Sequence, residues 1–292
     1  MMNRVLAAFL ATTALLLTGL SGGNPPEKAI TIPFNEKDKS QKYLTFDVEI
    51  NGKSMNALYD TGAVVAARLL KNSAERNGIP IEGGGYDIKI GDILLKGMPI
   101  RCVDRFKTNY CKDIILGQGV IKNLYAVIDF PTNRALFIPC SKETSYAEAD
   151  KRAKELFGDV LREVAIPLVS PEGHILVAAS LPGKEKLHFA VDTGWLGYSF
   201  LTSEATRRWG ITGQMVRLDL VMEGETFKQT LFKNKSDASM EREVLNFRKH
   251  GLNFGGILGV PDFLGLYRIG IDYKEMKMHV GFPKKEEAGK AK

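Results

Sequence analysis

The chain has 292 residues, with 40 Lys and Arg against 34 Asp and Glu and a formal net charge of +6. This length is enough for two small domains, and a positive charge this mild and dispersed gives no indication of a nucleic-acid partner. A hydrophobic fraction of 44% is typical of a globular protein.

The first residues have the pattern of an export signal. Arg4 supplies a positive start, the apolar stretch after it is too short to span a bilayer, and Gly19-Leu20-Ser21 offers a small-x-small cleavage site. We therefore predict a signal peptide over residues 1–21, a polar leader over 22–42 and an extracytoplasmic mature protein, periplasmic or secreted. Because Leu20 stands where a lipoprotein signal carries Cys, we expect no stable membrane anchor after cleavage. An uncleaved apolar anchor is the alternative.

A predicted β-hairpin leads to the first notable motif. Residues 43–50 alternate between apolar and polar side chains, and Asn51-Gly52 is a turn signal before a second strand. That strand ends at Asp60-Thr61-Gly62, followed by Ala63. Gly62 permits a backbone corner closed to other residues, so the acid before it is presented at the end of a strand.

The next segment combines a short helix with a glycine-rich hairpin. Residues 63–77 include a predicted helix that ends at Gly78. Gly83, Gly84, Gly85 and Tyr86 then open an alternating run. These four residues are either a candidate flap over a bound ligand or a solvent loop. The apolar run Ile115-Leu116-Gly117 follows further along the chain.

The cysteines and histidines give no metal pattern. In an exported chain Cys102 and Cys111 are close enough in sequence to form a disulfide. Cys140 would then be unpaired, or it would replace one of these two cysteines in the disulfide. The four histidines are scattered, and none pairs at ligand spacing. We expect no metal and no cofactor.

A charged segment with helical periodicity divides the chain. Between residues 142 and 163, apolar positions recur on one helical face. We interpret the segment as a helical linker that packs on its own chain, with a partner-binding helix as the alternative. It separates a first lobe over 43–141 from a second lobe over 164–283, and a charged tail follows over 284–292.

The second lobe repeats the first. A second hairpin ends at Asp192-Thr193-Gly194, followed by Trp195, and the run Ile257-Leu258-Gly259 comes later. The second copy is about ten residues longer, an insertion that a surface loop tolerates. We place the insertion between 213 and 254, with a strand over 215–222 and a helix or loop over 241–250.

The doubled motif resembles the retropepsin-like aspartic proteases, in the tandem single-chain form of bacteria. The resemblance covers about residues 30–141 and 164–282, and it implies a mainly β fold of two pseudo-twofold-related β-barrel lobes with an interlobe helix. It also implies a monomer with an extended peptide or protein substrate in the cleft between the lobes.

The resemblance assigns a role to each motif residue. Asp60 and Asp192 would be the catalytic pair, and Thr61 and Thr193 would lock the two active loops together. The active loops would also contain Gly62, Ala63, Gly194 and Trp195, with Ile115, Leu116, Gly117, Ile257, Leu258 and Gly259 as the scaffold beneath them.

Two adjacent carboxyl groups can hydrolyse an amide without a covalent intermediate. Held within hydrogen-bond reach, they share one proton, so one carboxylate activates water while the other acid protonates the carbonyl oxygen. Asp129 and Asp272 are also matched between the copies, but each begins a turn, so we interpret them as structural. Motifs of serine hydrolases, zinc proteases and nucleotide-binding enzymes are absent from the sequence.

Trp195 stands where the family carries Ser or Ala. Its indole either points away into the lobe interface, which leaves activity intact, or crowds the second acid as a wall of the cleft. Two functional hypotheses follow: an exported aspartic endopeptidase, and a catalytically silent peptide-binding protein that keeps the protease fold.

Overall fold

The computed structural model describes residues 29–34, 43–81, 85–106, 113–195, 197–235 and 238–284. The predicted signal peptide and all but the first residue of the charged tail lie outside these ranges, as does most of the predicted leader. No helix in these ranges is both long and apolar enough to cross a membrane.

The first lobe is a seven-stranded sheet with the strand order β6-β5-β2-β3-β8-β4-β7. The predicted hairpin is formed by β2 and β3, and both turn residues, Asn51 and Gly52, have positive φ, as a tight two-residue turn requires. The elements of this lobe are β2 (Thr45–Ile50), β3 (Lys53–Tyr59), β4 (Ala67–Leu70), α1 (Lys71–Arg76), β5 (Tyr86–Ile90), β6 (Ile93–Met98), β7 (Arg101–Val103), β8 (Ile114–Leu116) and α2 (Gln118–Ile121).

The second lobe repeats this pairing. In the first lobe β8 is parallel to β3 and antiparallel to β4, and in the second β17 is parallel to β13 and antiparallel to β14. Each acid-bearing strand therefore lies beside the strand that carries the apolar-apolar-Gly run. The elements are η1 (Pro171–Gly173), β12 (Leu176–Ala179), β13 (Leu187–Val191), β14 (Ser199–Thr202), α4 (Ser203–Trp209), β15 (Met215–Met222), β16 (Glu225–Lys235), α5 (Ala238–Lys249), β17 (Phe254–Leu258) and η2 (Leu264–Leu266).

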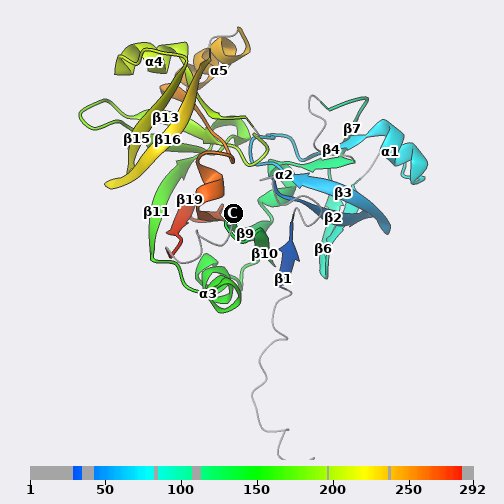
Figure 1. Cartoon of the computed structure of the whole chain (residues 1–292). Helices are drawn as coiled ribbons and strands as arrows, with labels where there is room; N and C mark the ends of the chain where they lie inside the picture. The colour runs from blue at the N-terminus through cyan, green and yellow to red at the C-terminus, as the bar shows by residue number, and fades with distance from the viewer. Residues whose placement is uncertain are drawn as a thin grey trace, which may run out of the picture.

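The lobes are joined by a central sheet with the strand order β1-β10-β9-β18-β19-β11 (Figure 1). It is one half of a continuous twelve-stranded sheet, because β11 also pairs with β12 of the second lobe. At its middle β9 and β18, one from each half of the chain, pair antiparallel, with Ile128 opposite Ile269. The strands are β1 (Ile30–Pro33), β9 (Leu124–Asp129), β10 (Arg134–Pro139), β11 (Arg162–Val169), β18 (Arg268–Asp272) and β19 (Lys277–Phe282). The prediction of a mainly β, two-lobed architecture with a helix between the halves is confirmed.

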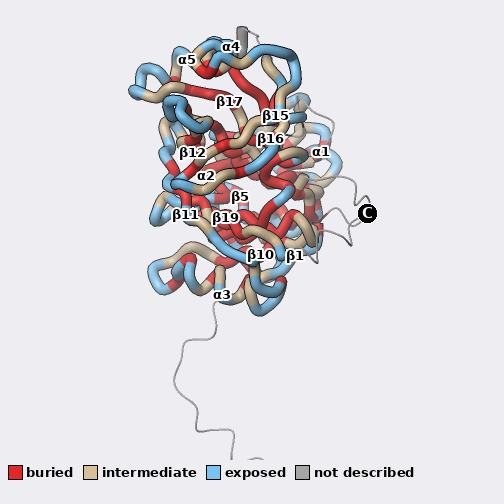
Figure 2. The backbone as a smooth tube through the Cα atoms, turned by 60° about the vertical axis from the view of Figure 1, so that its left-hand side comes forward, coloured by how far each residue is buried: buried red, intermediate tan, exposed pale blue. Residues whose placement is uncertain are grey.

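The linker helix α3 (Tyr146–Phe157) packs on one face of the central sheet. Ser145 caps it by accepting a hydrogen bond from the backbone N–H of Glu148. Its apolar face, which includes Tyr146, Ala149 and Phe157, contacts side chains of β9 and β10. The helix therefore covers its own chain, as the periodicity of this segment predicts. Figure 2 shows the buried residues concentrated in the strands, with exposed residues on the outer faces.

Asp129 stabilises its turn, as predicted, and also forms a buried ion pair. Its Oδ1 accepts from the backbone N–H of Thr132 in the turn, while its Oδ2 accepts from Nε and Nη2 of Arg268 at 3.0 and 2.6 Å. Both side chains are buried, with 4% and 7% of their area exposed. Asp272 is the turn acid predicted, accepting from the amides of Lys274 and Glu275.

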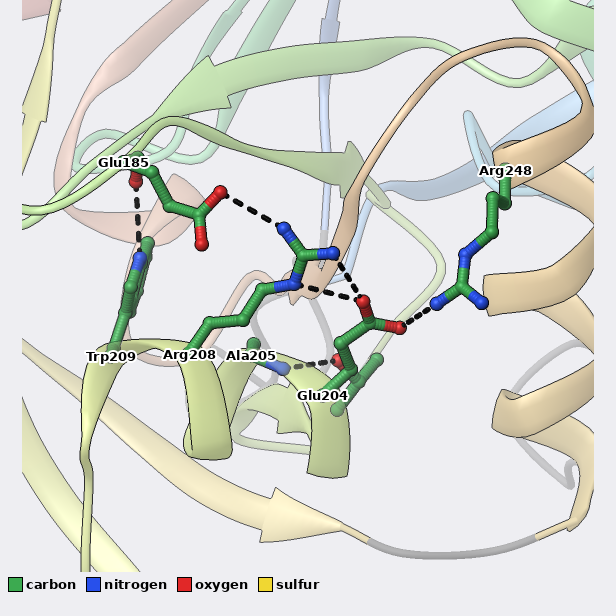
Figure 3. A network of polar contacts seen from close by, with 7 residues as sticks. Glu185, Glu204, Ala205, Arg208, Trp209 and Arg248 are labelled. Carbon is green, nitrogen blue, oxygen red and sulfur yellow. Dashed lines mark hydrogen bonds and ion pairs between the residues drawn. The ribbon is translucent and has the colours of Figure 1, made fainter.

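The segment 213–254, predicted to hold the insertion, forms the long β15–β16 hairpin and α5. The pairing of β16 with β14 matches that of β7 with β4, so α5 is the element without a described counterpart in the first lobe. Figure 3 shows how α5 is attached to α4: Arg248 donates to Glu204, and Arg208 bridges Glu204 and Glu185. Phe247 of α5 is buried against Phe254 of β17, with ring centroids 4.7 Å apart. The helix is thereby fixed over one face of β17.

Candidate active site

Asp60 and Asp192 occupy equivalent positions. Asp60 directly follows β3, and its backbone N–H donates to Leu116 O at 3.0 Å; Asp192 directly follows β13 and donates to Leu258 O at 3.2 Å. Each acid is thus held by a hydrogen bond to the leucine that directly precedes the glycine of the apolar-apolar-Gly run in the same lobe. The repeat in the sequence is a repeat in backbone geometry.

The two carboxyl groups meet and hydrogen-bond to each other. The glycine of each motif lies against the acid of the other. A Cβ atom added to Gly62 would lie 2.4 Å from Cγ of Asp192, and one added to Gly194 would lie 2.4 Å from Cγ of Asp60. Any side chain at these glycines would therefore force the acids apart, which explains why both motifs need glycine.

The dyad is electrostatically asymmetric. Backbone amides act on both acids: Oδ1 of Asp60 accepts from the N–H groups of Gly62 and Ala63, at 2.8 and 3.1 Å, and Asp192 accepts from those of Gly194, at 2.9 Å, and Trp195. The charge of Arg68 acts on Asp60. Burial raises the pKa of both carboxyl groups, and the charge of Asp60 raises the pKa of Asp192 further. The pair therefore holds one shared proton, and the charge of Arg68, which lowers the pKa of Asp60, favours Asp60 as the ionised member.

Thr61 and Thr193 join the active loops by four reciprocal hydrogen bonds. The Thr61 hydroxyl donates to Val191 O at 2.7 Å and accepts from the Thr193 N–H at 3.0 Å. The Thr193 hydroxyl donates to Tyr59 O at 2.9 Å and accepts from the Thr61 N–H at 3.0 Å. Both threonines have no exposed area, so water cannot replace these bonds if they are lost.

Thr61→Val is expected to lower the free energy of unfolding by about 2–4 kcal/mol, because it leaves a buried carbonyl and a buried amide without partners. Urea denaturation measures the loss, and Thr61→Ser, which keeps the hydroxyl, is the matched control. A valine variant as stable as the serine variant would contradict this role for the hydroxyl.

The two apolar runs pass directly beneath the active loops. Leu116 and Leu258 are fully buried in the core, while Ile115 contacts Leu58 and Ala63 in a separate small cluster. A Cβ atom added to Gly117 would lie 2.6 Å from Ala63 O, and one on Gly259 would lie 2.7 Å from the Trp195 indole. Ile257 occupies the place of Ile115, so all six scaffold residues lie where the repeat predicts.

Trp195 is held against its own lobe. Its indole N–H donates to Tyr198 O at 2.9 Å, and its ring centroid lies 5.2 Å from that of Phe200. Together with the close approach to Gly259, these contacts direct the ring into the second lobe. The indole therefore points neither into the lobe interface nor along the cleft wall, the two orientations expected, but into its own lobe.

The candidate flap is only partly described. Gly83 and Gly84 lie outside the described residues, and Gly85 approaches the backbone of Gly97. Tyr86 is 3% exposed in the lobe core, and its hydroxyl donates to Pro80 O at 2.6 Å. Including Tyr86 in a flap was therefore wrong, because the alternation of β5 turns this side chain inward.

The predicted Cys102–Cys111 disulfide involves a residue outside the described ranges, because Cys111 is not described. Cys102 and Cys140 are both free thiols. In the described ranges no three His, Cys, Asp or Glu side chains gather in an arrangement that could hold a metal ion.

Two polar residues of the site were missed from the sequence. Gln118, which directly follows Gly117, is buried and donates from Nε2 to Thr61 O at 2.6 Å. Its counterpart after Gly259 is Val260, so this support exists only in the first lobe. Arg68 lies close enough to Asp60 for its charge to lower the pKa of that carboxyl. The sequence shows an arginine in a strand and gives no sign of its closeness to the acid.

A solved structure shares this architecture. The crystal structure of an aspartic proteinase from Irpex lacteus matches 88% of this chain and 98% of its own chain, with a TM-score of 0.55 and 12% sequence identity. At this identity the likeness establishes the fold, which is the two-lobed fold of the pepsin-like aspartic proteinases. No protein-family model and no curated protein sequence matches the chain.

Proposed function

We propose that the protein is an exported aspartic endopeptidase of the single-chain, retropepsin-like kind. The observation that carries the proposal is the hydrogen-bonded pair of Asp60 and Asp192, each at the corner of a matched Asp-Thr-Gly loop and each with a raised pKa. The shared fold with an aspartic proteinase supports the same conclusion. The substrate would be a peptide or unfolded protein segment bound in extended form between the lobes of a monomer.

The asymmetry of the dyad suggests the roles of the two acids. Asp60, whose pKa is lowered by the charge of Arg68, would take a proton from a water molecule between the acids. Asp192 would donate its proton to the carbonyl oxygen of the scissile amide. The tetrahedral diol would then collapse as a proton passes to the leaving nitrogen, with no bond between enzyme and substrate.

Incubation with a mixed peptide pool at mildly acidic pH tests the proposal. We expect new termini that are absent when pepstatin, a hydroxyl-bearing mimic of the transition state, is added. If peptides and pepstatin bind without any hydrolysis, the catalytically silent binding protein becomes the better description. The contacts that hold the Trp195 indole against Tyr198, Phe200 and Gly259 of its own lobe favour the peptidase over that alternative.

The pH dependence of turnover is expected to be bell-shaped and displaced upward. Activity is lost at low pH when both acids are protonated and at high pH when both are ionised. Because burial raises both pKa values and Asp60 raises that of Asp192 further, the alkaline loss should come above the ordinary range of an Asp carboxyl. A kcat profile measures this, and a kcat that is already lost in the ordinary Asp range would contradict it.

The same ionisation predicts a change in stability. The unfolded chain releases the Asp192 proton at the lower, ordinary pKa. The free energy of unfolding should therefore fall as pH rises through the folded-state pKa, and Asp192→Asn should flatten that part of the curve.

A further inference from the structure

A row of five residues crosses the first lobe from the active loop outward. Successive strand partners place Thr45 beside Leu58, Leu58 beside Ile115, Ile115 beside Arg68 and Arg68 beside Arg101. Directly paired residues project from the same face of a sheet. The middle of the row, Leu58 and Ile115, is apolar, and its outer part is a pair of adjacent arginines.

This row belongs to the face of the sheet that carries the dyad. Leu58 and Ile115 contact Ala63 of the active loop, and the charge of Arg68 reaches Asp60. The neighbours of Arg68 in β4, Ala67 and Leu69, point into the lobe core instead. In Figure 1, β4 and β7 lie on the side of the first lobe away from α3.

Neither arginine forms an ion pair with a carboxylate of the described residues. Like charges on neighbouring strands repel, so an adjacent pair is normally balanced by an acid. Every ion pair found between described residues leaves Arg68 and Arg101 out: the nearby acids Asp104 and Asp113 pair with Lys71 and Arg76. Arg68 is half-buried and Arg101 exposed, so both guanidinium groups are placed to receive an anion from the solvent side.

The second lobe does not repeat this feature. Its equivalent row is Leu176, Ala190, Ile257, Phe200 and Lys233. Phe200, at the position of Arg68, is 1% exposed and packs on Trp195. α5 covers this face, because Phe247 and Phe254 pack against Leu176 and Ala190. The cationic pair is thus a property of one half-site.

We propose that Arg68 and Arg101 form a subsite for a carboxylate side chain of the substrate, so that the protein prefers peptides with Asp or Glu at one position on the first-lobe side of the scissile bond. The planar guanidinium groups fit a carboxylate, and the apolar part of the row receives the neighbouring substrate side chain. This inference rests on the proposed peptidase function and names its substrate class.

The cleavage-site profile of a degenerate peptide pool tests the subsite. We expect enrichment of Asp and Glu at one position in the wild type, and a fall of about tenfold in the kcat/KM ratio of a Glu peptide to its Gln match in Arg68→Gln and Arg101→Gln. Arg68→Lys should keep part of the preference. Lys233→Gln, the equivalent change in the second lobe, is the matched control and should keep all of it.

The pH dependence of this ratio separates recognition from a structural role. The preference for Glu over Gln should disappear below about pH 4, where the substrate carboxyl is protonated. An unchanged ratio in Arg68→Gln, or a loss of preference in Lys233→Gln alone, would overturn the proposal.

A binding measurement distinguishes failure of the subsite from failure of the proposed function. Two statine peptides that differ only in Glu or Gln beside the statine report Kd without turnover. If the wild type cleaves nothing but binds the Glu peptide about tenfold more tightly, and Arg68→Gln loses that difference, the subsite stands and the peptidase proposal falls. Equal affinities in the wild type would overturn the subsite whatever the activity.

Discussion

Replacing Asp60 or Asp192 with Asn is expected to lower kcat for peptide hydrolysis by about 10⁴-fold or more. An amide in place of Asp60 cannot take a proton from water, and one in place of Asp192 cannot supply the proton that the carbonyl oxygen needs. Because the two acids act as a unit, the double variant should be little worse than either single variant. Cleavage of a peptide found in the pool experiment measures the loss.

The control for these variants is Asp92→Asn. Asp92 is an exposed acid at the turn between β5 and β6. The Asp92→Asn substitution removes the same charge without changing the dyad and should leave kcat unchanged. Asn is nearly the size of Asp, so the variants should keep the circular dichroism of the wild type. A folded Asp60→Asn variant with even a tenth of wild-type kcat would exclude the proposed mechanism.

The second large effect concerns stability: Arg268→Leu should lower the free energy of unfolding by about 3–5 kcal/mol. The substitution leaves the buried carboxylate of Asp129 without its counter-ion. It also removes the donor to the carbonyls of Gly158 and Phe157, which follow and end α3. The central sheet and the linker helix would both lose an attachment. Urea denaturation at neutral pH measures the loss in free energy of unfolding.

Two further variants show whether the cost comes from the unpaired charge. Arg268→Leu combined with Asp129→Leu should recover much of the lost stability, since no buried charge is then left alone. Arg134→Leu removes an arginine that also contacts Phe157 and donates to Leu156 O, but this arginine is half-buried and its loss leaves no buried carboxylate unpaired. It should cost less than about 1 kcal/mol. Equal losses in the Arg134 and Arg268 variants would rule out a special cost of the buried pair.

The two-lobed architecture could be predicted because the sequence contains two copies of the same motifs in the same order. Strand alternation, the Asn51-Gly52 turn and the repeated motifs each specify local structure, and the repeat adds that the two copies face each other. The helix α3 was predictable for the same local reason, an apolar face among charges. The segment over 241–250 stayed ambiguous because few apolar positions, such as Phe247, mark the buried face of α5.

Contacts set by register between distant strands could not be predicted. Arg268 meets Asp129 only because β9 and β18 pair with these residues opposite each other. Arg68 stands beside Arg101 for the same kind of reason. The burial of Tyr86 shows a related limit: alternation places residues on two faces of a strand, but the sequence does not say which face the lobe covers.

The bonds between Thr61 and Thr193 have a consequence for biosynthesis. The hydroxyl of Thr61 finds its acceptor 130 residues further along the chain, at Val191. A ribosome that has released only the first half has therefore made an acid, a loop and a scaffold that lack their counterparts. The Asp60–Asp192 pair forms only after most of the second half has been translated and folded against the first. Under the proposed function, a nascent chain would therefore have no peptidase activity towards itself or its neighbours.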